Sequence, residues 1–456
     1  MKTKKRIGFI AMSGVRAHNA ELTALGLTLP GFVERNKQIA SLPSLGLLTL
    51  AGMTPRDSFD VEYHEIADLK VLPELPAHFD LVAISTFTAQ FYEACEVADH
   101  YRQLGVAVVM GGITVSALVE QSLEHCTSVV VGEGELCWPE VLQDLQAGKL
   151  QRVYAQIPGG TFDLREAPMP RFDLLDPDKY NRITVQTSRG CPHRCEFCAS
   201  SILLTRHYKV KPVEKVIAEL HAIKSIWPKP FIEFADDNSF IHRDHYKRLL
   251  RAMAREDLRW FTETDVRVAE DDELLALMRD AGCQQILIGL ESPRRRSLEG
   301  IELKSNWKAR QQDHYRAAIA KIQSYGITVN GCFIVGLDHD NPKVFDNVLQ
   351  FVRESGLYEV QVTFPTAFPG TPFYRRLRAE GRILRDQAWE LCTLFDINIK
   401  PANLSVTELQ SGFLDLVRQL YSESETQTRR RRFRRMLRTS PNFGCKLRGE
   451  ETSLAA

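Results

Sequence analysis

The stretch ITVQTSRGCPHRCEFCAS, residues 183–200, joins a short β-rich run to three closely spaced cysteines. Cys191, Cys195 and Cys198 follow a Cys-x3-Cys-x2-Cys pattern directly after the run. Cysteine thiolates bind zinc or iron–sulfur clusters, and structural zinc sites and electron-transfer clusters both use four protein ligands. Two interpretations remain open. His193 or His207 completes a zinc site, or a four-iron cluster keeps one iron free for a small molecule.

The sequence after this run alternates between strand and helix signals. β-rich runs recur at residues 231–234, 258–263, 285–289, 327–336 and 358–364, with helical patterns such as 212–226 and 271–282 between them. Six βα units predict a partial barrel over residues 183–370. Barrel active sites lie at the carboxyl ends of the strands, so the cysteines stand where such a site is built.

The sequence before this run predicts a different α/β unit. Short β-rich runs lie at residues 6–12, 59–66, 79–86, 106–112 and 128–134, and a helical pattern covers 89–104. Such alternation predicts a doubly wound parallel sheet over residues 1–150. Residues 151–182 are rich in Pro, Gly and Asp and are expected to form a linker. Residues 371–456 are expected to form a helical C-terminal region.

Composition limits the classes of function. The 456 residues suit two or three domains, and Lys+Arg equals Asp+Glu at 58 each, so overall charge indicates neither nucleic acid nor an anionic membrane as partner. No signal peptide or transmembrane run is evident, so we expect a reducing cytoplasm, where clustered thiols serve metals or chemistry. The remaining cysteines are expected as small buried hydrophobic residues: Cys95, Cys126, Cys137, Cys283, Cys332, Cys392 and Cys445.

An arginine-rich segment lies near the C-terminus. TRRRRFRRMLR, residues 428–438, carries seven arginines between Arg429 and Arg438. Its simplest interpretation is a solvated surface helix or a frayed tail. The alternative is a site for an anionic substrate or headgroup.

The cysteine spacing, Phe197 just before the third cysteine and the βα units behind them together resemble the radical S-adenosylmethionine (SAM) superfamily. The resemblance implies that Cys191, Cys195 and Cys198 hold a [4Fe-4S] cluster whose free iron chelates SAM. It implies that reduction by an external donor of flavodoxin or ferredoxin type releases a 5′-deoxyadenosyl radical. The cofactors would carry the chemistry, and the protein would orient them.

The resemblance also implies cofactor-binding residues at later strand ends. Glu233, Asp236 or Asp237 is expected to contact the amino group of the methionine part of SAM. The Gly-Gly-Glu form of many members is missing here. The alternative is that Asp237 or Asn238 caps a helix. Glu263 and Arg267 follow the third strand, where a surface ion pair is the alternative. Glu291 is expected to hold the ribose hydroxyls of SAM. The segment with Phe333, Val335 and Gly336 is expected to pack on adenine, and the alternative is that these residues simply belong to the core.

The first domain resembles the cobalamin-binding fold that precedes the radical domain in one large subclass. Its strand-end loops carry small residues that admit a wide planar ligand, or form ordinary tight turns: Ser85, Thr86, Gly111, Gly112, Gly132 and Gly134. The Asp-x-His-x-x-Gly motif that supplies a lower cobalt ligand is missing, and His18 lacks its context. Cobalamin would then bind without a histidine of this chain, or the domain is vestigial.

The resemblance favours methylation of an unactivated carbon in a small-molecule or lipid-like substrate, with cobalamin carrying the methyl group. Radical cyclisation, oxidation or rearrangement without methyl transfer is the alternative. A methylthiotransferase fits less well, because its N-terminal domain needs a second cysteine trio. The alternative that is not an enzyme is a zinc-stabilised binding protein, whose arginine-rich tail would bind an anionic partner.

Overall fold

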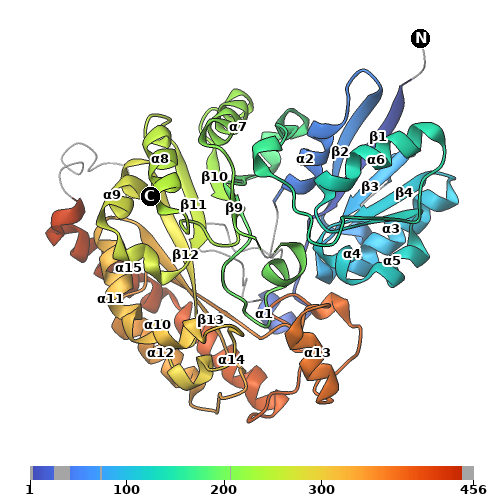
Figure 1. The fold of residues 1–456 in the computed structure, drawn as a ribbon. Coiled ribbons are helices and arrows are strands. Elements are labelled where there is room, and N and C mark those ends of the chain that lie inside the picture. The colour runs from blue at the N-terminus through green and yellow to red at the C-terminus, as the bar shows by residue number, and fades with distance from the viewer. Residues whose placement is uncertain (1–3, 25–41, 72–73, 206, 444–456) are drawn as a thin grey trace.

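The computed structural model describes residues 4–24, 42–71, 74–205 and 207–443, so Cys445 lies outside the described residues. Two α/β units stand side by side, and C-terminal helices pack on both of them (Figure 1). In the described ranges, no helix combines the length and apolar character needed to cross a bilayer.

The N-terminal unit is a parallel six-stranded sheet in the order β2-β1-β3-β4-β5-β6. Its strands are β1 (Lys5–Met12), β2 (Phe59–Ile66), β3 (Leu81–Ser85), β4 (Ala107–Gly111), β5 (Ser128–Val131) and β6 (Val153–Ala155). The predicted doubly wound sheet is confirmed. Edge strand β6 pairs in parallel with β5, although its residues fall within the stretch expected to be a linker.

Helices cover both faces of this sheet because alternate strand residues point to opposite sides. On β1, Phe9 joins the core under α2 and α6, whereas Ile10 joins the core under α3. The helices are α1 (Ala20–Ala24), α2 (Leu45–Met53), α3 (Phe91–Gln103), α4 (Ile113–Ala117), α5 (Val119–His125) and α6 (Gly134–Ala147).

The second unit is a six-stranded parallel sheet in the order β14-β13-β12-β11-β10-β7. Its strands are β7 (Ile183–Val185), β10 (Phe231–Phe234), β11 (Arg259–Thr264), β12 (Cys283–Glu291), β13 (Thr328–Ile334) and β14 (Glu359–Thr363). β7 and β14 stand at opposite edges, which agrees with the predicted partial barrel. Its helices are α7 (Val213–Ile226), α8 (Arg243–Met253), α9 (Asp272–Asp280), α10 (Trp307–Gln311), α11 (Tyr315–Ser324) and α12 (Val344–Ser355).

The inner face of this sheet is polar. Closed barrels usually fill their interior with branched apolar side chains. Here apolar strand residues such as Ile232 and Val329 join the core on the helix side, and many of the alternate positions carry polar groups. These include Thr184, Glu233, Glu263, Gln285, Asn330 and Gln361.

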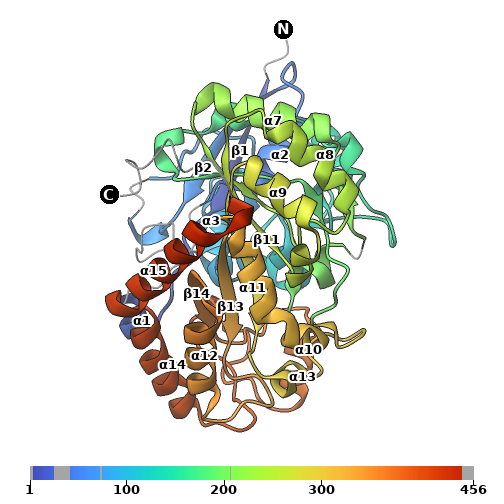
Figure 2. The ribbon, with the colours of Figure 1, turned by 90° about the vertical axis from the view of Figure 1, so that its left-hand side faces the viewer.

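The C-terminal region contacts both units. α13 (Pro372–Ala379) supplies Phe373 and Leu377 to a core of the N-terminal unit, whereas α14 (Val406–Leu420) packs on α12. α15 (Glu423–Thr439) packs on α11 and α14 along the outer side of the barrel (Figure 2).

α15 carries the arginine-rich segment, and two of its arginines are structural. Buried Arg429 donates to the carbonyl of Leu420 at 2.7 Å, and Arg432 donates to the carbonyls of Arg353 and Glu354 at the end of α12. Other arginines of the segment, such as Arg434 and Arg435, are exposed. The simplest interpretation allowed a surface helix or a frayed tail, and the structure shows the surface helix.

Candidate active site

The cysteine loop is held by short strands on both sides. β8 (Ser188–Arg189) pairs antiparallel with β9 (Lys209–Val210), and Gly190 follows with φ +89°. A Cβ at Gly190 would lie 2.6 Å from the carbonyl oxygen of His207, so only glycine fits there. The Gly190 N–H donates to Asp237 Oδ2 at 2.7 Å, which ties the loop to the end of β10.

A second loop pairs with the cysteines from the other side. Cys195 forms a β-bridge with Glu302, and the Leu303 N–H donates to the Arg194 carbonyl at 2.9 Å. Burial alone would raise the pKa of Glu302, but the backbone N–H groups of Ser305 and Trp307 hold it at about 2. Glu302 is therefore ionised and fixes both loops through its hydrogen bonds.

The three thiols lie close enough to affect one another. Burial raises the pKa of Cys191 to about 11, with Cys198 adding to the rise, and burial raises the pKa of Cys195 further, with both neighbouring thiols contributing. Three thiolates at such spacing repel one another unless cations lie between them. The loop therefore gathers three thiols of the kind that ligate an iron–sulfur cluster.

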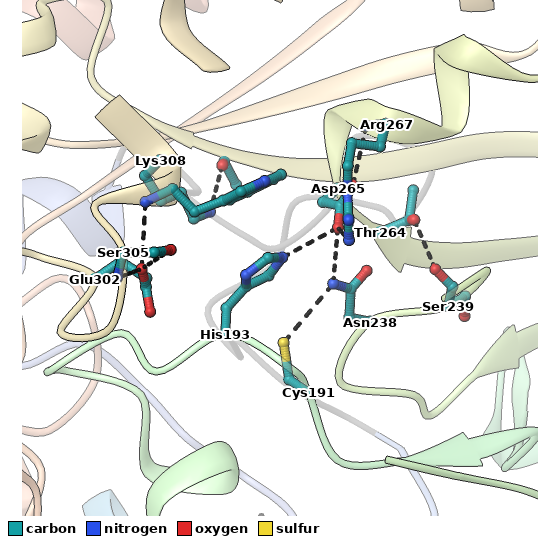
Figure 3. Close-up of polar contacts among 12 residues, drawn as sticks. Cys191, His193, Asn238, Ser239, Thr264, Asp265, Arg267, Glu302, Ser305 and Lys308 are labelled. Atoms are coloured by element: carbon teal, nitrogen blue, oxygen red, sulfur yellow. Dashed lines mark hydrogen bonds and ion pairs between the residues drawn. The ribbon is translucent and has the colours of Figure 1, made fainter. Parts of the chain in front are cut away.

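Asp265, at the end of β11, links the residues behind the cysteine loop (Figure 3). Its Oδ2 accepts hydrogen bonds from Asn238 at 3.1 Å and Arg267 at 3.0 Å, and pairs with His193 Nε2 at 3.3 Å. Burial would raise the pKa of Asp265, but His193 and Arg267 hold it well below its usual range. Asn238 also donates to Cys191 Sγ at 3.7 Å.

Neither histidine suggested for a zinc site is placed as a simple fourth ligand. His193 stacks on Trp307 with ring centroids 4.0 Å apart, in addition to its contact with Asp265, and His207 is exposed. Across the described ranges, no three His, Cys, Asp or Glu side chains are arranged to hold a single metal ion.

The acidic residues after β10 differ in their availability. Asp236 is completely enclosed and accepts from Thr187, Ser188, Ser239 and Tyr246. Its oxygens are thus already taken, and the expectation that Asp236 contacts a cofactor is replaced by a structural role. Glu233 is also occupied, since it forms an ion pair with buried Arg182. Asp237 alone borders the cysteine loop.

Glu263 and Glu291 lie at the mouth of the barrel. The Glu263 side chain is accessible, yet burial among Glu233, Asp237 and Glu291 raises its pKa to about 8, as expected for a carboxyl that faces an internal space. Glu291 has a strained φ of +61° and pairs with Lys308 at 2.7 Å.

The residues expected at adenine are placed differently. The Phe333 ring is fully buried against Phe351 of α12, on the helix side of the sheet, and Val335 is also buried in that core. Gly336, with φ +103°, forms a turn whose N–H bonds Asp340. The Phe333 and Val335 side chains thus belong to the core, the alternative that the sequence left open, and the alternate residue Cys332 faces the interior. Contact of the backbone of this segment with adenine stays a prediction.

A cavity of about 720 Å³ opens between the two α/β units. Its N-terminal wall contains all six small residues expected at the strand ends: Ser85, Thr86, Gly111, Gly112, Gly132 and Gly134. Gln186, Arg189 and Ala199 line it from the barrel, next to the cysteine loop, and Phe368 and Leu394 line it from the C-terminal region. The cavity thus extends from the N-terminal strand ends to residues just before and just after the cysteine loop, although the three cysteines themselves are not among its lining residues.

The glycines in this wall keep the cavity wide. A Cβ at Gly111 or Gly134 would meet only one neighbouring side chain, Val130 or Leu50, so it would take up cavity space. Gly112 has φ +100°, a conformation that only glycine adopts without strain. His18 is exposed and is not among the lining residues.

Comparison with known proteins assigns both units. The radical SAM superfamily model matches residues 185–352, which include the three cysteines, and the B12 binding domain model matches residues 40–142. The chain belongs to the radical SAM superfamily. It is of the subclass with an N-terminal B12-binding domain, and residues 371–454 match a domain of unknown function.

Relatives of this radical SAM chain share both units. Bacteriochlorophyllide d C-12(1)-methyltransferase of Chlorobaculum tepidum is 26% identical, over 85% of this chain and 84% of that protein. Hopanoid C-2 methylase of Rhodopseudomonas palustris is 27% identical, over 76% of this chain and 66% of that protein. The solved radical SAM methyltransferase TsrM of Kitasatospora setae shares the fold, with a TM-score of 0.62 and 17% identity over 83% of this chain and 75% of that one.

The barrel interior of the radical SAM domain also fits a polar ligand. Thr184, Gln285, Asn330 and Gln361 each bury a side-chain polar atom that has no hydrogen-bond partner within the described ranges. Such atoms are costly unless a ligand or water satisfies them. Polar side chains at the mouth and interior therefore suit the amino-acid and nucleoside groups of SAM.

Several residues of the site were missed from the sequence. Asn238, named there only as a possible helix cap, bonds Cys191, while Lys308 pairs with Glu291, and Cys332 lies near both Glu263 and Glu291. Strand alternation identifies Cys332, because Val329 and Phe333 face the helices. Lys308 has no such signal, since it lies on the short helix α10 and not at a strand end.

Proposed function

We propose that this protein is a cobalamin-dependent radical SAM methyltransferase that acts on an unactivated carbon of a small-molecule or lipid-like substrate. The observation that carries the proposal is the cavity that reaches from the N-terminal strand ends to Arg189 and Ala199, on either side of the cysteine loop. Bringing two reactants into one enclosed space converts a bimolecular step into an effectively unimolecular one. A methyl donor in the N-terminal wall would thus face the substrate beside the radical source.

Each part of the site has a role in this proposal. Cys191, Cys195 and Cys198 hold the cluster, and Asn238, Asp237 and Glu302 orient their loop. When bound, the cluster and SAM supply a 5′-deoxyadenosyl radical, and cobalamin supplies the methyl group. Glu263, whose pKa is raised to about 8, would donate a hydrogen bond to SAM, and Glu291, which pairs with Lys308, would accept from the ribose of SAM.

The relatives and the cavity lining support a proposal for the substrate class. Relatives are named for bacteriochlorophyllide and hopanoid methylation, so their substrates are large and mainly apolar. The cavity here is walled by apolar side chains such as Leu47, Leu50 and Phe368. We therefore place the substrate among lipid-like or tetrapyrrole-like molecules.

The proposal requires an electron donor and a reducing location. The cluster receives its electron from an external flavodoxin or ferredoxin, and the cytoplasm keeps the thiols available. All nine cysteines in the described ranges are free.

A labelled methyl group tests the proposal. Protein reconstituted with iron, sulfide and cobalamin is incubated anaerobically with reductant, methyl-deuterated SAM and a panel of hopanoids and chlorins. We expect 5′-deoxyadenosine together with a product that carries the label. The Cys191→Ala/Cys195→Ala/Cys198→Ala variant should lose both, whereas Cys137→Ala, a buried cysteine of α6, should keep both.

One observation favours a second function. Anaerobic magnesium-protoporphyrin IX monomethyl ester cyclase of Rubrivivax gelatinosus is 24% identical over 60% of this chain and 54% of that protein. Formation of 5′-deoxyadenosine and an altered chlorin, without transfer of the label, would replace methylation by radical cyclisation or oxidation.

A further inference from the structure

Four ionisable side chains are buried together where the two α/β units meet. Arg189 donates to Glu133 and to Glu135, each at 2.6 Å, and Lys209 donates to Glu133 at 2.6 Å. The side chains of Arg189, Glu133, Glu135 and Lys209 are 10%, 0%, 9% and 12% exposed. We call these four residues the interdomain ion cluster.

The two carboxylates of this cluster belong to the cavity wall of the N-terminal unit, and its two cations belong to the strands beside the cysteine loop. Glu133 is the N-cap of α6 and Glu135 lies in its first turn, on either side of Gly134, and both line the cavity. Arg189 ends β8 and stands two residues before Cys191, while Lys209 is its partner on β9. The cluster therefore connects the cavity wall directly with the strand that carries the cysteine loop.

Charge balance makes this connection specific. Two carboxylates from the N-terminal unit meet two cations from the barrel, so each charge finds its partner only when the units stand in this one arrangement. Gln186 Oε1 accepts from Arg189 Nη2 at 2.9 Å, and the Phe162 N–H donates to Glu133 at 2.8 Å. Any sliding of one unit on the other would leave a buried charge without its partner, which is strongly unfavourable.

Stability alone does not require charges at this interface. Apolar side chains of similar size often stabilise a protein as well as a buried ion pair does, and the best-attested role of such pairs is to fix register. Reacting atoms need their alignment to within about 1 Å, since a misplacement of that size costs roughly 10²-fold in rate. Buried ion pairs that fix how the two units are placed would provide this alignment between two cofactors, each held by one unit.

We propose that the interdomain ion cluster sets the position of cobalamin relative to the iron–sulfur cluster. Glu133, Glu135 and Arg189 are then positioning residues for methyl transfer. This inference rests on the proposed function, because it assumes that cobalamin occupies the cavity.

A spin–spin measurement tests the inference without turnover. Cobalamin in its cob(II) state and the reduced iron–sulfur cluster each carry an unpaired electron, so their dipolar coupling in electron paramagnetic resonance reports their separation. Wild-type protein loaded with both cofactors should give one narrow distribution of distances. Arg189→Met should broaden or shift this distribution while it still binds both cofactors. Glu135→Gln, which changes no side-chain volume, is the second variant in case the first fails to fold.

The matched control is another buried ion pair. Lys211 and Glu219 lie 2.6 Å apart with side chains 4% and 2% exposed, but both belong to the barrel unit. Lys211→Met should therefore lower stability and leave the distance distribution unchanged.

Three results would overturn the inference. An unchanged distribution in folded Arg189→Met or Glu135→Gln would show that the cluster does not set the distance. Equal broadening in Lys211→Met would assign the effect to general loss of stability. Wild-type protein that binds no cobalamin would refute the proposed function together with this inference, whereas the first two results leave the proposed function intact.

Discussion

Asn238 Nδ2 lies 3.7 Å from Cys191 Sγ and donates a hydrogen bond to it, while Asp265 holds the same amide at 3.1 Å (Figure 3). The turn after β10 thus reaches the first cysteine of the loop after β7. A donor to sulfur stabilises the more negative, reduced state of an iron–sulfur cluster. Asn238 is therefore placed to influence how readily the cluster accepts its electron.

Replacing Asn238 by leucine should lower the midpoint potential of the cluster. The variant keeps the size of the side chain but removes the N–H donor, so the reduced state loses stabilisation. Redox titration followed by electron paramagnetic resonance measures the change. Asn398→Leu, whose amide bonds Arg385 far along the chain, is the control and should leave the potential unchanged. An equal potential in Asn238→Leu and wild type would remove Asn238 from the cluster environment.

Glu291→Ala should weaken SAM binding by about 1–3 kcal/mol, the range for loss of a hydrogen bond to a charged group. The variant also removes the ion pair with Lys308, which keeps its bond to the Gly289 carbonyl, so Lys308→Met serves as its companion and separates loss of the ion pair from loss of the acceptor. Calorimetric titration of the reconstituted protein with SAM gives both affinities. If Glu291→Ala binds SAM as wild type does, Glu291 has no part in the site.

The apo protein should lose stability as pH rises, because of Glu263. Its pKa rises from 4.5 in the unfolded chain to about 8 in the fold, mainly through burial. Folded protein therefore binds this proton more tightly. The contribution to stability is fully present below pH 4.5, falls between pH 4.5 and about 8, and does not change further above that range.

Glu263→Gln isolates this contribution, because the amide cannot ionise. Thermal unfolding between pH 5 and pH 8 should show a flatter profile in the variant, with the variant the more stable protein at pH 8. Glu299→Gln, on an exposed turn, should keep the wild-type profile. Parallel profiles for wild type and Glu263→Gln would contradict the assignment of a raised pKa to Glu263.

Gly112→Val should abolish cobalamin retention and leave the iron content intact. Gly112 lines the cavity with φ +100°, so the new side chain both strains the loop and enters the space that the corrin needs. Gly105→Val is the matched control, because Gly105 also has a positive φ of +77° but has open space around it and lies away from the cavity. Equal loss of cobalamin in both variants would attribute the effect to backbone strain.

The fold was largely predictable because each strand carries its own local signal. Runs such as 59–66 and 231–234 alternate or concentrate β-branched and aromatic residues, and the structure places β2 and β10 at these same bounds. The sequence did not predict β6, because this strand is only three residues long and is stabilised by pairing with β5. The pattern of residues within a short segment does not reveal a pairing with a strand elsewhere in the chain.

The sequence located residues well where position along a strand decides where they lie. The three cysteines share one loop and the loop glycines line one cavity, while their roles toward a cofactor stay predictions. The sequence could not show availability where the environment decides it: Asp236 carries the same side chain as Asp237, but its oxygens accept five hydrogen bonds from Thr187, Ser188, Ser239 and Tyr246. Arg189 and Glu133 were invisible as partners because they lie on separate units and meet only in the folded protein.

Binding of cobalamin to the anaerobically reconstituted protein tests the central claim most directly. Hydroxocobalamin is titrated while its visible spectrum and the fluorescence of Trp138, which lines the cavity, are followed against a Trp138→Phe control. We predict one cobalamin per chain, with a spectrum that lacks nitrogen ligation from below. Absence of binding at concentrations on the order of 100 μM, where even a weak complex of about −5 kcal/mol would form in part, would contradict the claim that both cofactors share this cavity.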